Sequence, residues 1–212
     1  MVPTTKKNNS RVGAIILAAG KSTRMGEPKQ LLRLGQSTVL ERTLENIRGA
    51  GLDEIVLVLG SSAEAIRQHL PASAFEALTV VVNEGYDQGM AGSLREGLSV
   101  VHPQIDAVLI VLADQPFIRP ETLDQIVDRY RRSKAQIVIP TYKGSRGNPV
   151  LLDRSVFPEI EALNGDIGFR AIFASHSDGI VKVEVEDNGI LLDIDDKADY
   201  ERLQGFRTGL PS

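Results

Sequence analysis

Short apolar runs recur along this chain and alternate with longer amphipathic segments. Each run is rich in Val, Ile or Leu and shows little alternation of apolar with polar residues, which is typical of strands buried on both faces of a parallel sheet. The runs are Val12–Ala18, Ile55–Leu59, Leu78–Val82, Ala107–Leu112 and Ile137–Pro140. This pattern predicts an α/β fold whose β-α units are joined by right-handed crossovers.

The segments between the apolar runs have the pattern expected of surface helices. Gly49 and Pro71 stand where two of these helices should end, and Pro120 stands where another should begin. The expected helices are Thr38–Gly49, Ala63–Leu70, Ala91–Val101 and Pro120–Arg132, with a last one near Lys197–Gln204. We therefore predict a three-layer α/β/α domain over residues 12–212 with a mostly parallel sheet, preceded by a disordered tail at residues 1–11.

The composition excludes several classes of function. The 212 residues include no cysteine, which rules out disulfides, thiolate metal sites and a thiol nucleophile. The net charge is -4 and no run of basic residues is longer than two, so we expect no nucleic-acid partner. No apolar run approaches the roughly 20 residues of a membrane helix, and the polar start of the chain lacks the apolar core of a signal peptide. We expect a cytoplasmic protein without a membrane partner.

The loop after the first apolar run has the composition of an anion-binding site. The small residues Ala18, Ala19 and Gly20 allow the backbone to pass close to a ligand, and successive backbone N–H groups there can bind an anion. Arg24 and Lys29 add two cations within the same loop. Together they would hold a triphosphate and offset charge on a pyrophosphate leaving group. The alternative is a surface loop in which glycine only turns the chain.

Two better-known phosphate-binding motifs do not fit this loop. Gly20-Lys21-Ser22 resembles the end of a Walker A loop, but that loop requires a glycine where this chain has Ile15. The Gly-x-Gly-x-x-Gly fingerprint of dinucleotide-binding folds does not follow the first strand either. A P-loop is thereby excluded, and a nicotinamide-dependent reductase is disfavoured.

The segment Leu17–Leu32 (LAAGKSTRMGEPKQLL) resembles the signature of the molybdenum cofactor nucleotidyltransferases, within the wider sugar-nucleotide transferase superfamily. Five further motifs follow in the order found in that family. They are Asn83 with Gly89–Leu94, Ala113–Pro116, Gly147–Val150, Gly165–Arg170 and Asp193–Asp195. The resemblance covers the chain from Val12 to about Leu203. It implies a Rossmann-like nucleotidyltransferase fold and a magnesium-dependent transferase.

Details of the motifs point to one branch of that family. The branch that transfers CMP usually has Ala-Ala-Gly in the first loop, as at residues 18–20, whereas the GMP-transferring branch has Leu-Ala-Gly-Gly. The run Pro28–Leu32 also resembles the cytidylyl branch. The resemblance thus implies CTP and molybdopterin as substrates. Two departures are Asn148, where the family often has His, and Asp196–Asp199, which replaces a commoner Thr-Pro-Glu-Asp.

Asp114 is the first candidate for a metal ligand. It closely follows the strand Ala107–Leu112 and should lie at the carboxyl end of the sheet, where α/β proteins bind ligands. Carboxylate oxygens suit Mg²⁺, which is usually held by one or two carboxylates together with substrate phosphates. The family resemblance makes Asp195 the second ligand, with Asp193 as a weaker candidate. For both Asp114 and Asp195 the alternative role is that of a helix cap.

Roles for the remaining motif residues are hypotheses that come with the resemblance. Arg24, Lys29 and Asp114 are the expected catalytic residues, while Asn83 would contact the base or ribose. The expected nucleotide-binding residues are Leu17, Ala18, Ala19, Gly20, Lys29, Asn83 and Asp114. The expected acceptor-binding residues are Ser93, Asn148, Asp166 and Arg170. The alternatives are an N-capping role for Ser93 and an ion pair that shapes a loop for Asp166 and Arg170.

The implied reaction is attack by the terminal phosphate of molybdopterin on the α-phosphorus of CTP. The second pKa of a phosphate is about 6, so the attacking oxygen is ionised and needs no general base. Three alternatives stay open: GMP transfer from GTP, nucleotidyl transfer to another phosphorylated acceptor, and a non-catalytic carrier that delivers the cofactor to a molybdoenzyme. Transient contact with a molybdoenzyme is compatible with each pterin-based hypothesis.

Overall fold

The computed structural model describes residues 10–22, 25–163 and 169–205. The strands are β1 Val12–Ala18, β2 Arg33–Leu34, β3 Ser37–Thr38, β4 Glu54–Leu59, β5 Thr79–Val82, β6 Ala107–Leu112, β7 Ile137–Tyr142, β8 Ser145–Arg146, β9 Val150–Asp153 and β10 Ile180–Glu184. The α-helices are α1 Val39–Arg48, α2 Ala63–His69, α3 Met90–Val100, α4 Pro120–Ser133, α5 Phe157–Glu161 and α6 Lys197–Leu203.

The main sheet has the strand order β10-β7-β9-β6-β1-β4-β5, and β8 pairs with β7. The central strand β1 is parallel to β4 on one side and to β6 on the other. Strand β9 is antiparallel to both of its neighbours, β6 and β7. The predicted mostly parallel sheet is therefore confirmed, with one reversed strand in its interior.

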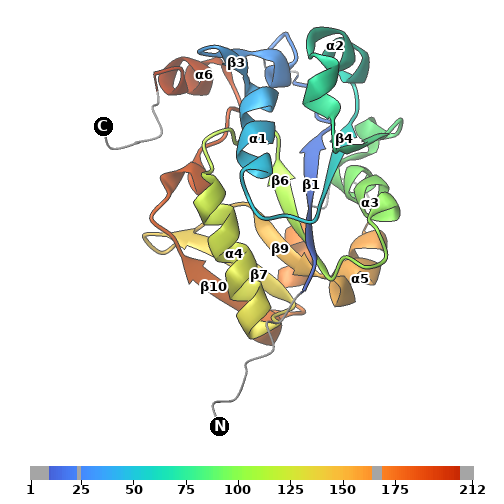
Figure 1. The fold of residues 1–212 in the computed structure, drawn as a ribbon, viewed down its shortest axis with the longest axis vertical. Helices are drawn as coiled ribbons and strands as arrows, with labels where there is room; N and C mark the ends of the chain where they lie inside the picture. Colours follow the sequence, from blue (N-terminus) through green and yellow to red (C-terminus); the bar gives the residue numbers. More distant parts are fainter. Residues whose placement is uncertain (1–9, 23–24, 164–168, 206–212) are drawn as a thin grey trace.

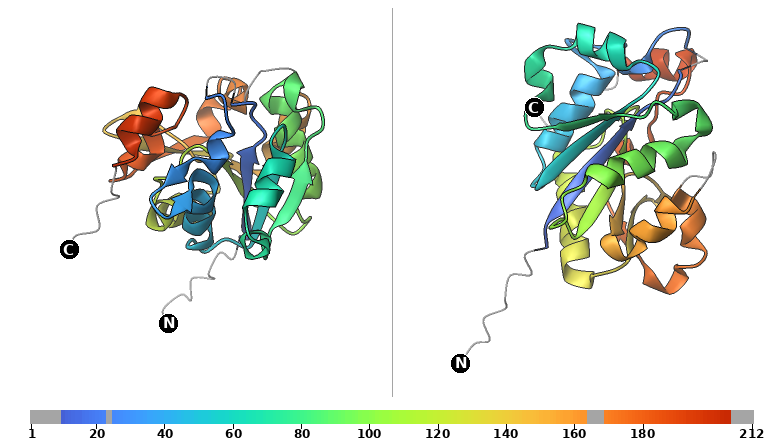
Figure 2. Two further views of the ribbon diagram at one scale, coloured as in Figure 1. Left: turned by 90° about the horizontal axis from the view of Figure 1, so that it is seen from above. Right: turned by 90° about the vertical axis from the view of Figure 1, so that its right-hand side faces the viewer.

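Apolar residues on both faces of the sheet create the three layers. Helices α1, α2 and α4 pack on one face through a cluster that includes Leu44, Ile66 and Leu123. Helices α3 and α5 pack on the other face through a second cluster that includes Leu94 and Ile160. Figure 1 shows α1 and α4 in front of the sheet, and the right-hand view of Figure 2 shows helices on its two sides. The predicted α/β/α class is confirmed.

All of the predicted strands and helices are present, with ends displaced by at most two residues. Strands β9 and β10, the short helix α5 and the two-residue strands β2, β3 and β8 were not predicted from the sequence. Strand β9 has only four residues and directly follows Gly147-Asn148-Pro149, which read as irregular chain. Strand β10 is an edge strand whose residues are partly or fully exposed, so it lacks the continuous apolar run of a buried strand.

The predicted tail includes two residues that belong to the folded domain. The backbone carbonyl of Ser10 accepts a hydrogen bond from Arg131 Nε at 3.3 Å. The backbone N–H of Arg11 donates to Asp106 Oδ2 at 2.9 Å. Residues 1–9 of that tail lie outside the described residues.

A third apolar cluster joins the start of the domain to its end. Its residues are Leu32 and Leu34 at the β2–β3 hairpin, Val39 at the start of α1, Phe117 in the loop after β6, Ile194 before α6 and Leu203 in α6. The hydroxyl of Tyr200 donates to the carbonyl of Arg33 at 2.8 Å and reinforces this contact. The cluster places the C-terminal acidic segment next to the loop that carries Lys29.

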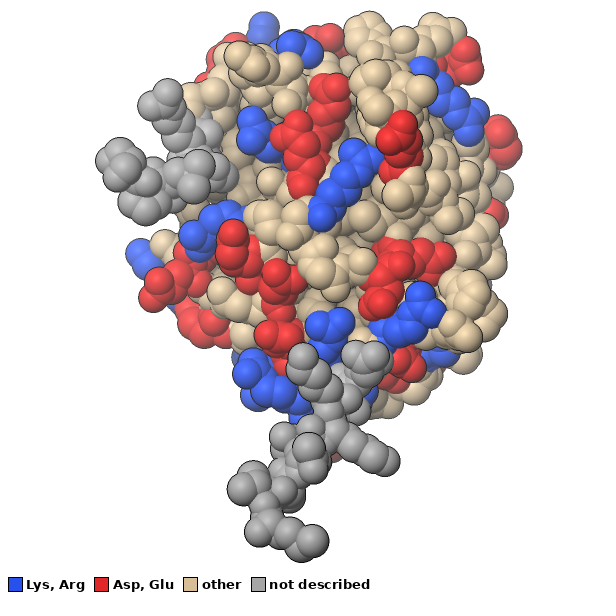
Figure 3. All heavy atoms as spheres, in the orientation of Figure 1, with Lys and Arg blue, Asp and Glu red and all other residues tan. Residues whose placement is uncertain are grey.

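The charged side chains on the face formed by α1 and α4 are mixed in sign. Figure 3 shows acidic and basic residues interspersed over this face, without an extended basic patch. Within the described ranges, no helix combines the length and apolar character needed to cross a membrane.

Gly97 allows α3 to lie close to the sheet and thereby sets one wall of the cavity described below. A Cβ at this position would be 2.6 Å from Ile15 Cγ2 and 3.1 Å from Val58 Cγ2. We expect Gly97→Ala to lower the free energy of unfolding by about 1–3 kcal/mol through overpacking. Alanine gains about 1 kcal/mol over glycine in an unhindered helix, so an equally stable variant in urea denaturation would refute the close approach. Ser99→Ala, on the exposed side of α3, is the control.

Candidate active site

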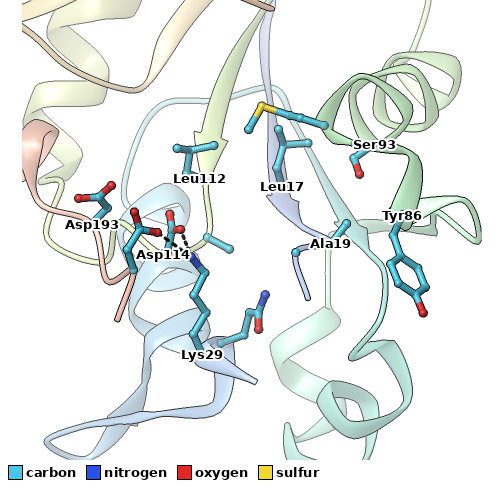
Figure 4. Close-up of a pocket in the computed structure, with 14 residues that line it drawn as sticks. Leu17, Ala19, Lys29, Tyr86, Ser93, Leu112, Asp114 and Asp193 are labelled. Atoms are coloured by element: carbon cyan, nitrogen blue, oxygen red, sulfur yellow. Dashed lines mark hydrogen bonds and ion pairs between the residues drawn. The ribbon is translucent and has the colours of Figure 1, made fainter. Parts of the chain in front are cut away.

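A cavity of about 390 Å³ opens at the carboxyl ends of β1 and β6. The chain runs from β1 towards β4 and β5 and then returns to β6 on the other side of β1. Ligands of α/β sheets bind at such a reversal of strand order. The cavity is lined by Leu17, Ala19, Gly20, Lys29, Gln30, Tyr86, Gly89, Met90, Ser93, Leu112, Ala113, Asp114, Asp193 and Asp195. Figure 4 shows this site.

Lys29 connects two carboxylates at one end of the cavity. Its ammonium group donates to Asp114 Oδ2 and lies 3.3 Å from Asp195 Oδ1. The side chains of Lys29 and Asp114 are 16% and 15% exposed, whereas that of Asp195 is 45% exposed. Burial by itself lowers the pKa of Lys29, but the two carboxylates outweigh this effect and raise its pKa above the ordinary 10.5. Lys29 is therefore cationic throughout the physiological pH range.

The acidic end of the cavity has unused capacity to bind a cation. Asp114 Oδ1 is buried and has no hydrogen-bond partner among the described residues. Asp193 also lines the cavity, and burial raises its pKa above the ordinary 3.8, with a further contribution from the charges of Asp195 and Asp114. Three carboxylates beside Lys29, with one free oxygen on Asp114, are the kind of ligand set that suits a hard divalent cation.

These residues fit a metal that is completed by substrate. Across the described ranges, no group of three or more His, Cys, Asp or Glu side chains is arranged around one point as ready-made ligands. Mg²⁺ is usually held by one or two carboxylates plus phosphate oxygens and waters, rather than by a full cage of protein ligands. Asp114 and Asp195 match that smaller requirement, because both already bind the same ammonium group.

Backbone contacts bring Asp195 to its position. The N–H of Ile194 donates to the carbonyl of Asp114 at 3.0 Å, which joins the C-terminal segment directly to the end of β6. The cap of α6 is Asp196, whose carboxylate accepts from the N–H of Asp199 at 2.9 Å. The carboxylate of Asp195 is thus not used as a helix cap. The cap of α4 is Arg119, so Asp114 does not have that role either.

A buried carboxylate, that of Asp187, binds the segment that leads to Asp195 to the start of α4. Asp187 is 5% exposed and lies just before the 3₁₀ turn Asn188–Leu191. It accepts hydrogen bonds from the Arg119 N–H at 2.9 Å and from the Thr122 hydroxyl at 2.6 Å. These bonds fix the C-terminal segment to the start of α4.

The first loop offers mainly backbone to the cavity. Leu17, Ala19 and Gly20 line it, while the carbonyl of Ala18 accepts a hydrogen bond from Gln30 Nε2 at 3.2 Å. Gly60, in the loop after β4, supports this backbone from behind. A Cβ on Gly60 would be 2.6 Å from the carbonyl oxygen of Ala19. Only a residue without a side chain fits between the two loops.

Asn83 and Ser93 form a buried pair beside the cavity. The amide of Asn83 donates to Ser93 Oγ at 3.0 Å and accepts from the N–H of Gly85 at 2.9 Å. Ser93 lines the cavity, but Asn83 does not. Ser93 also does not cap α3, because Gly89 precedes that helix. Asn83 therefore holds the cavity wall in place from behind.

The other predicted acceptor residues lie apart from this cavity. Arg170 Nη2 donates to Asn148 Oδ1 at 3.2 Å, and neither residue lines the cavity. The predicted residues Arg24 and Asp166 lie outside the described residues. The structure therefore brings together the first loop, Lys29, Ser93 and the acidic residues, but not the complete predicted acceptor set.

Gln30 and Tyr86 are polar residues that line the cavity and that were not among the predicted site residues. Gln30 is 2% exposed, and its Oε1 is buried and unpartnered within the described structure. Tyr86 stands in the loop after β5, with the ammonium of Lys21 5.7 Å from its ring centroid. Both residues lie in loops at the carboxyl edge of the sheet. This position, which follows from the predicted strands, could have identified them in the sequence.

The chain is similar to two proteins over nearly its full length. It is 27% identical over 199 residues to nicotine blue oxidoreductase of Paenarthrobacter nicotinovorans, covering 91% of this chain and 96% of that protein. It is 29% identical over 196 residues to the purine catabolism protein PucB of Bacillus subtilis, covering 90% and 94%.

Two solved structures are also similar to this chain over nearly its full length. Rv0371c of Mycobacterium tuberculosis has a TM-score of 0.81 and 35% identity, covering 93% of this chain and 99% of that one. A structure of Rv0371c in complex with manganese has a TM-score of 0.78 and 34% identity, covering 92% and 98%. The family model of the MobA-like NTP transferase domain matches residues 14–180. With its fold and its acidic, loop-walled cavity, this chain belongs to the MobA-like NTP transferases, a family of nucleotidyltransferases.

Proposed function

We propose that this protein transfers CMP from CTP to the terminal phosphate of molybdopterin, with Mg²⁺ as the metal and pyrophosphate as the second product. The observation that carries the proposal is the convergence of Asp114 and Asp195 on Lys29, beside the backbone of the first loop. One end of the cavity thus combines a lysine, carboxylates for a divalent cation and backbone that can approach phosphates.

Asp114 and Asp195 would hold the metal. Support comes from the unpartnered Asp114 Oδ1 and from the similar mycobacterial protein whose structure is described as a manganese complex. When bound, the metal supplies positive charge to the phosphate oxygens and to the departing pyrophosphate. Lys29 and the N–H groups of the first loop would orient the triphosphate and stabilise the same charge.

The proposed chemistry needs no proton acceptor on the protein. An ionised oxygen of the acceptor phosphate forms a bond to the α-phosphorus of CTP, and the bond from that phosphorus to the β-phosphate oxygen breaks. The electron pair leaves with pyrophosphate, and no proton has to be removed from the nucleophile. This agrees with the cavity lining, since no histidine is among the residues that form it.

The two ends of the cavity suggest a division between nucleoside and phosphates. Figure 4 shows Lys29, Asp114 and Asp193 on one side and Ser93 and Tyr86 on the other. Transfer to the acceptor must occur where charge can be neutralised, which is the acidic end. We therefore assign Ser93 to the nucleoside rather than to the acceptor, and we keep Asn148, Asp166 and Arg170 as the proposed acceptor residues.

The choice of CTP rests on the sequence Ala18-Ala19-Gly20 and on the run Pro28–Leu32, which resemble the cytidylyl branch. An oxidoreductase is the second candidate, because one relative that aligns with nearly the whole chain has that name. Three carboxylates line one end of the cavity, and Lys29 pairs with two of them. This excess of negative charge favours a triphosphate that binds together with a metal, because a dinucleotide that binds without a metal would be repelled.

Pyrophosphate release should distinguish these functions. With Mg²⁺ and molybdenum-loaded molybdopterin, we expect release with CTP to exceed release with GTP by roughly 10–200-fold, the range available to a pocket that discriminates by shape. Faster release with GTP would assign the protein to the guanylyl branch. Binding of NTP without release would point to another acceptor or to a carrier. Binding of NADPH in place of any NTP would favour the oxidoreductase.

Replacement of Asp114 should abolish most of the activity without unfolding the protein. Asp114→Asn keeps the side-chain shape but removes the charge that pairs with Lys29 and would bind the metal. We expect kcat to fall by roughly 10²–10³-fold, with a cooperative thermal transition retained. Asp87→Asn, on an exposed side chain outside the cavity, should keep nearly full activity. Near-normal turnover of Asp114→Asn would remove Asp114 from the metal site.

Initial rates at varied Mg²⁺ should identify the second metal ligand. Asp195 shares Lys29 with Asp114, whereas the described structure gives Asp193 no bond to this lysine. We expect the Mg²⁺ concentration for half-maximal rate to rise roughly tenfold in Asp195→Asn, a change of about 1.4 kcal/mol. The increase should be clearly smaller in Asp193→Asn. The reverse order would assign the second ligand to Asp193.

A further inference from the structure

Lys29 occupies the point at which two carboxylates of the proposed metal site converge. Its ammonium binds Asp114 Oδ2 and lies 3.3 Å from Asp195 Oδ1. The backbone N–H of Lys29 donates to Ser22 Oγ at 3.1 Å, which fixes the base of the side chain. Figure 4 shows the lysine stem extending from its turn to the carboxylates. The interaction is thus made by a flexible stem on a fixed backbone.

A metal bound to the same two oxygens would need this space. Mg²⁺ lies about 2.0–2.1 Å from its oxygen ligands. A cation at that distance from Asp114 Oδ2 and Asp195 Oδ1 would overlap or nearly touch the ammonium group of Lys29. Two like charges at such a separation repel strongly where solvent is largely excluded, and the Lys29 and Asp114 side chains are only 16% and 15% exposed. The carboxylates can therefore bind the metal or the ammonium in this position, but not both.

We propose that Lys29 acts as an internal counter-ion, which occupies the metal site until metal and NTP bind together and then moves to the phosphates. The site already contains the second position, because Ala19 and Gly20 line the same cavity as Lys29. The lysine side chain has a four-carbon stem and a compact charge, so it can change partners while its backbone stays bonded to Ser22.

The exchange makes the metal and the nucleotide dependent on each other. A metal that binds alone displaces the ammonium and leaves it without a counter-ion. A triphosphate provides the anion that the displaced ammonium requires. By thermodynamic linkage, the nucleotide must then raise metal affinity by the same factor by which the metal raises nucleotide affinity. This coupling disfavours a metal-loaded site that contains no substrate.

The competing arrangement leaves Lys29 where it is. In that case the metal binds through the unpartnered Asp114 Oδ1, and the ammonium keeps its contacts with Asp114 Oδ2 and Asp195. The two arrangements predict different effects on metal affinity, measured without nucleotide, when the charge of Lys29 is removed. Exchange predicts stronger binding, because a competing cation has been removed from the site.

The test measures binding of Mn²⁺, without nucleotide or acceptor, from the electron paramagnetic resonance signal of the free ion. We expect Lys29→Met to bind Mn²⁺ about tenfold more tightly than the wild type, within the usual range of coupling between sites. Lys21→Met is the matched control, since Lys21 lies on the same loop over the Tyr86 ring at 5.7 Å. Its Mn²⁺ affinity should change by less than about twofold, the size of a weak, screened interaction.

Unchanged or weaker Mn²⁺ binding by a folded Lys29→Met would overturn the exchange. A second measurement uses the wild type and avoids a variant that fails to fold: acetylation of Lys29 by a water-soluble ester, followed by mass spectrometry. Saturating Mg²⁺ alone should accelerate modification of Lys29 but not of Lys21, and equal rates with and without Mg²⁺ would contradict the proposal.

The metal measurements do not depend on which NTP is the substrate, although the second half of the exchange rests on the proposed nucleotidyl transfer. If CTP is not the substrate, the effect of Lys29→Met on Mn²⁺ alone persists, and only the effect of CTP on Mn²⁺ affinity is lost. With the correct NTP, the wild type should gain about tenfold in Mn²⁺ affinity. No gain with any NTP that binds would overturn the exchange of Lys29 onto phosphate.

Discussion

The site depends on the meeting of one ammonium group with two carboxylates that are distant in sequence. Lys29 is separated from Asp114 by 85 residues and from Asp195 by 166. Each of the three side chains comes from a different part of the fold: the turn after the first loop, the end of β6 and the segment before α6. Lys29 and Asp114 are largely removed from water, and buried charges are costly unless they are paired. The fold must therefore position these three segments together, and much of its less regular structure does so.

The C-terminal segment shows how this positioning is achieved. It has little regular structure of its own, yet a bond from Ile194 to the carbonyl of Asp114 adds it to the end of β6. The buried Asp187 ties its beginning to α4, and the packing of Leu203 in the third apolar cluster ties its end to the β2–β3 hairpin. A hydrogen-bonded carboxylate and a small apolar cluster thus fix the position of this segment, whereas β1 and β6 are fixed by pairing within the sheet.

The sequence predicted the parts of the site that follow from local pattern. Asp114 closely follows the apolar strand β6, and Lys29 lies in the connection that follows the apolar strand β1, so their place at the carboxyl edge followed from strand direction. Asp195 was predicted only from a family resemblance, since its position depends on tertiary contacts with no local pattern.

The short reversed strand β9 was missed for a related reason. Its four residues lie between β6 and β7 and are stabilised by pairing with both neighbours rather than by their own strand propensity. Asn83 was chosen for its chemistry, and in the structure its amide donates to Ser93 Oγ beside the cavity.

The distribution of charge within the cavity constrains how a nucleotide can lie in it. Figure 4 places Lys29, Asp114 and Asp193 at one side, opposite Ser93 and Tyr86. A triphosphate needs cations and a metal, whereas a base needs apolar or aromatic contact and a few hydrogen bonds. For the proposed substrate, only one orientation satisfies both needs: the base beside Tyr86 and the phosphates towards Lys29.

The acceptor must then approach from the acidic side, where it meets three carboxylates before it meets the α-phosphorus. A phosphate acceptor carries negative charge, so this approach is favourable only after a metal has neutralised that end of the cavity. In the proposed reaction, the carboxylates that would hold the metal thereby oppose transfer in its absence.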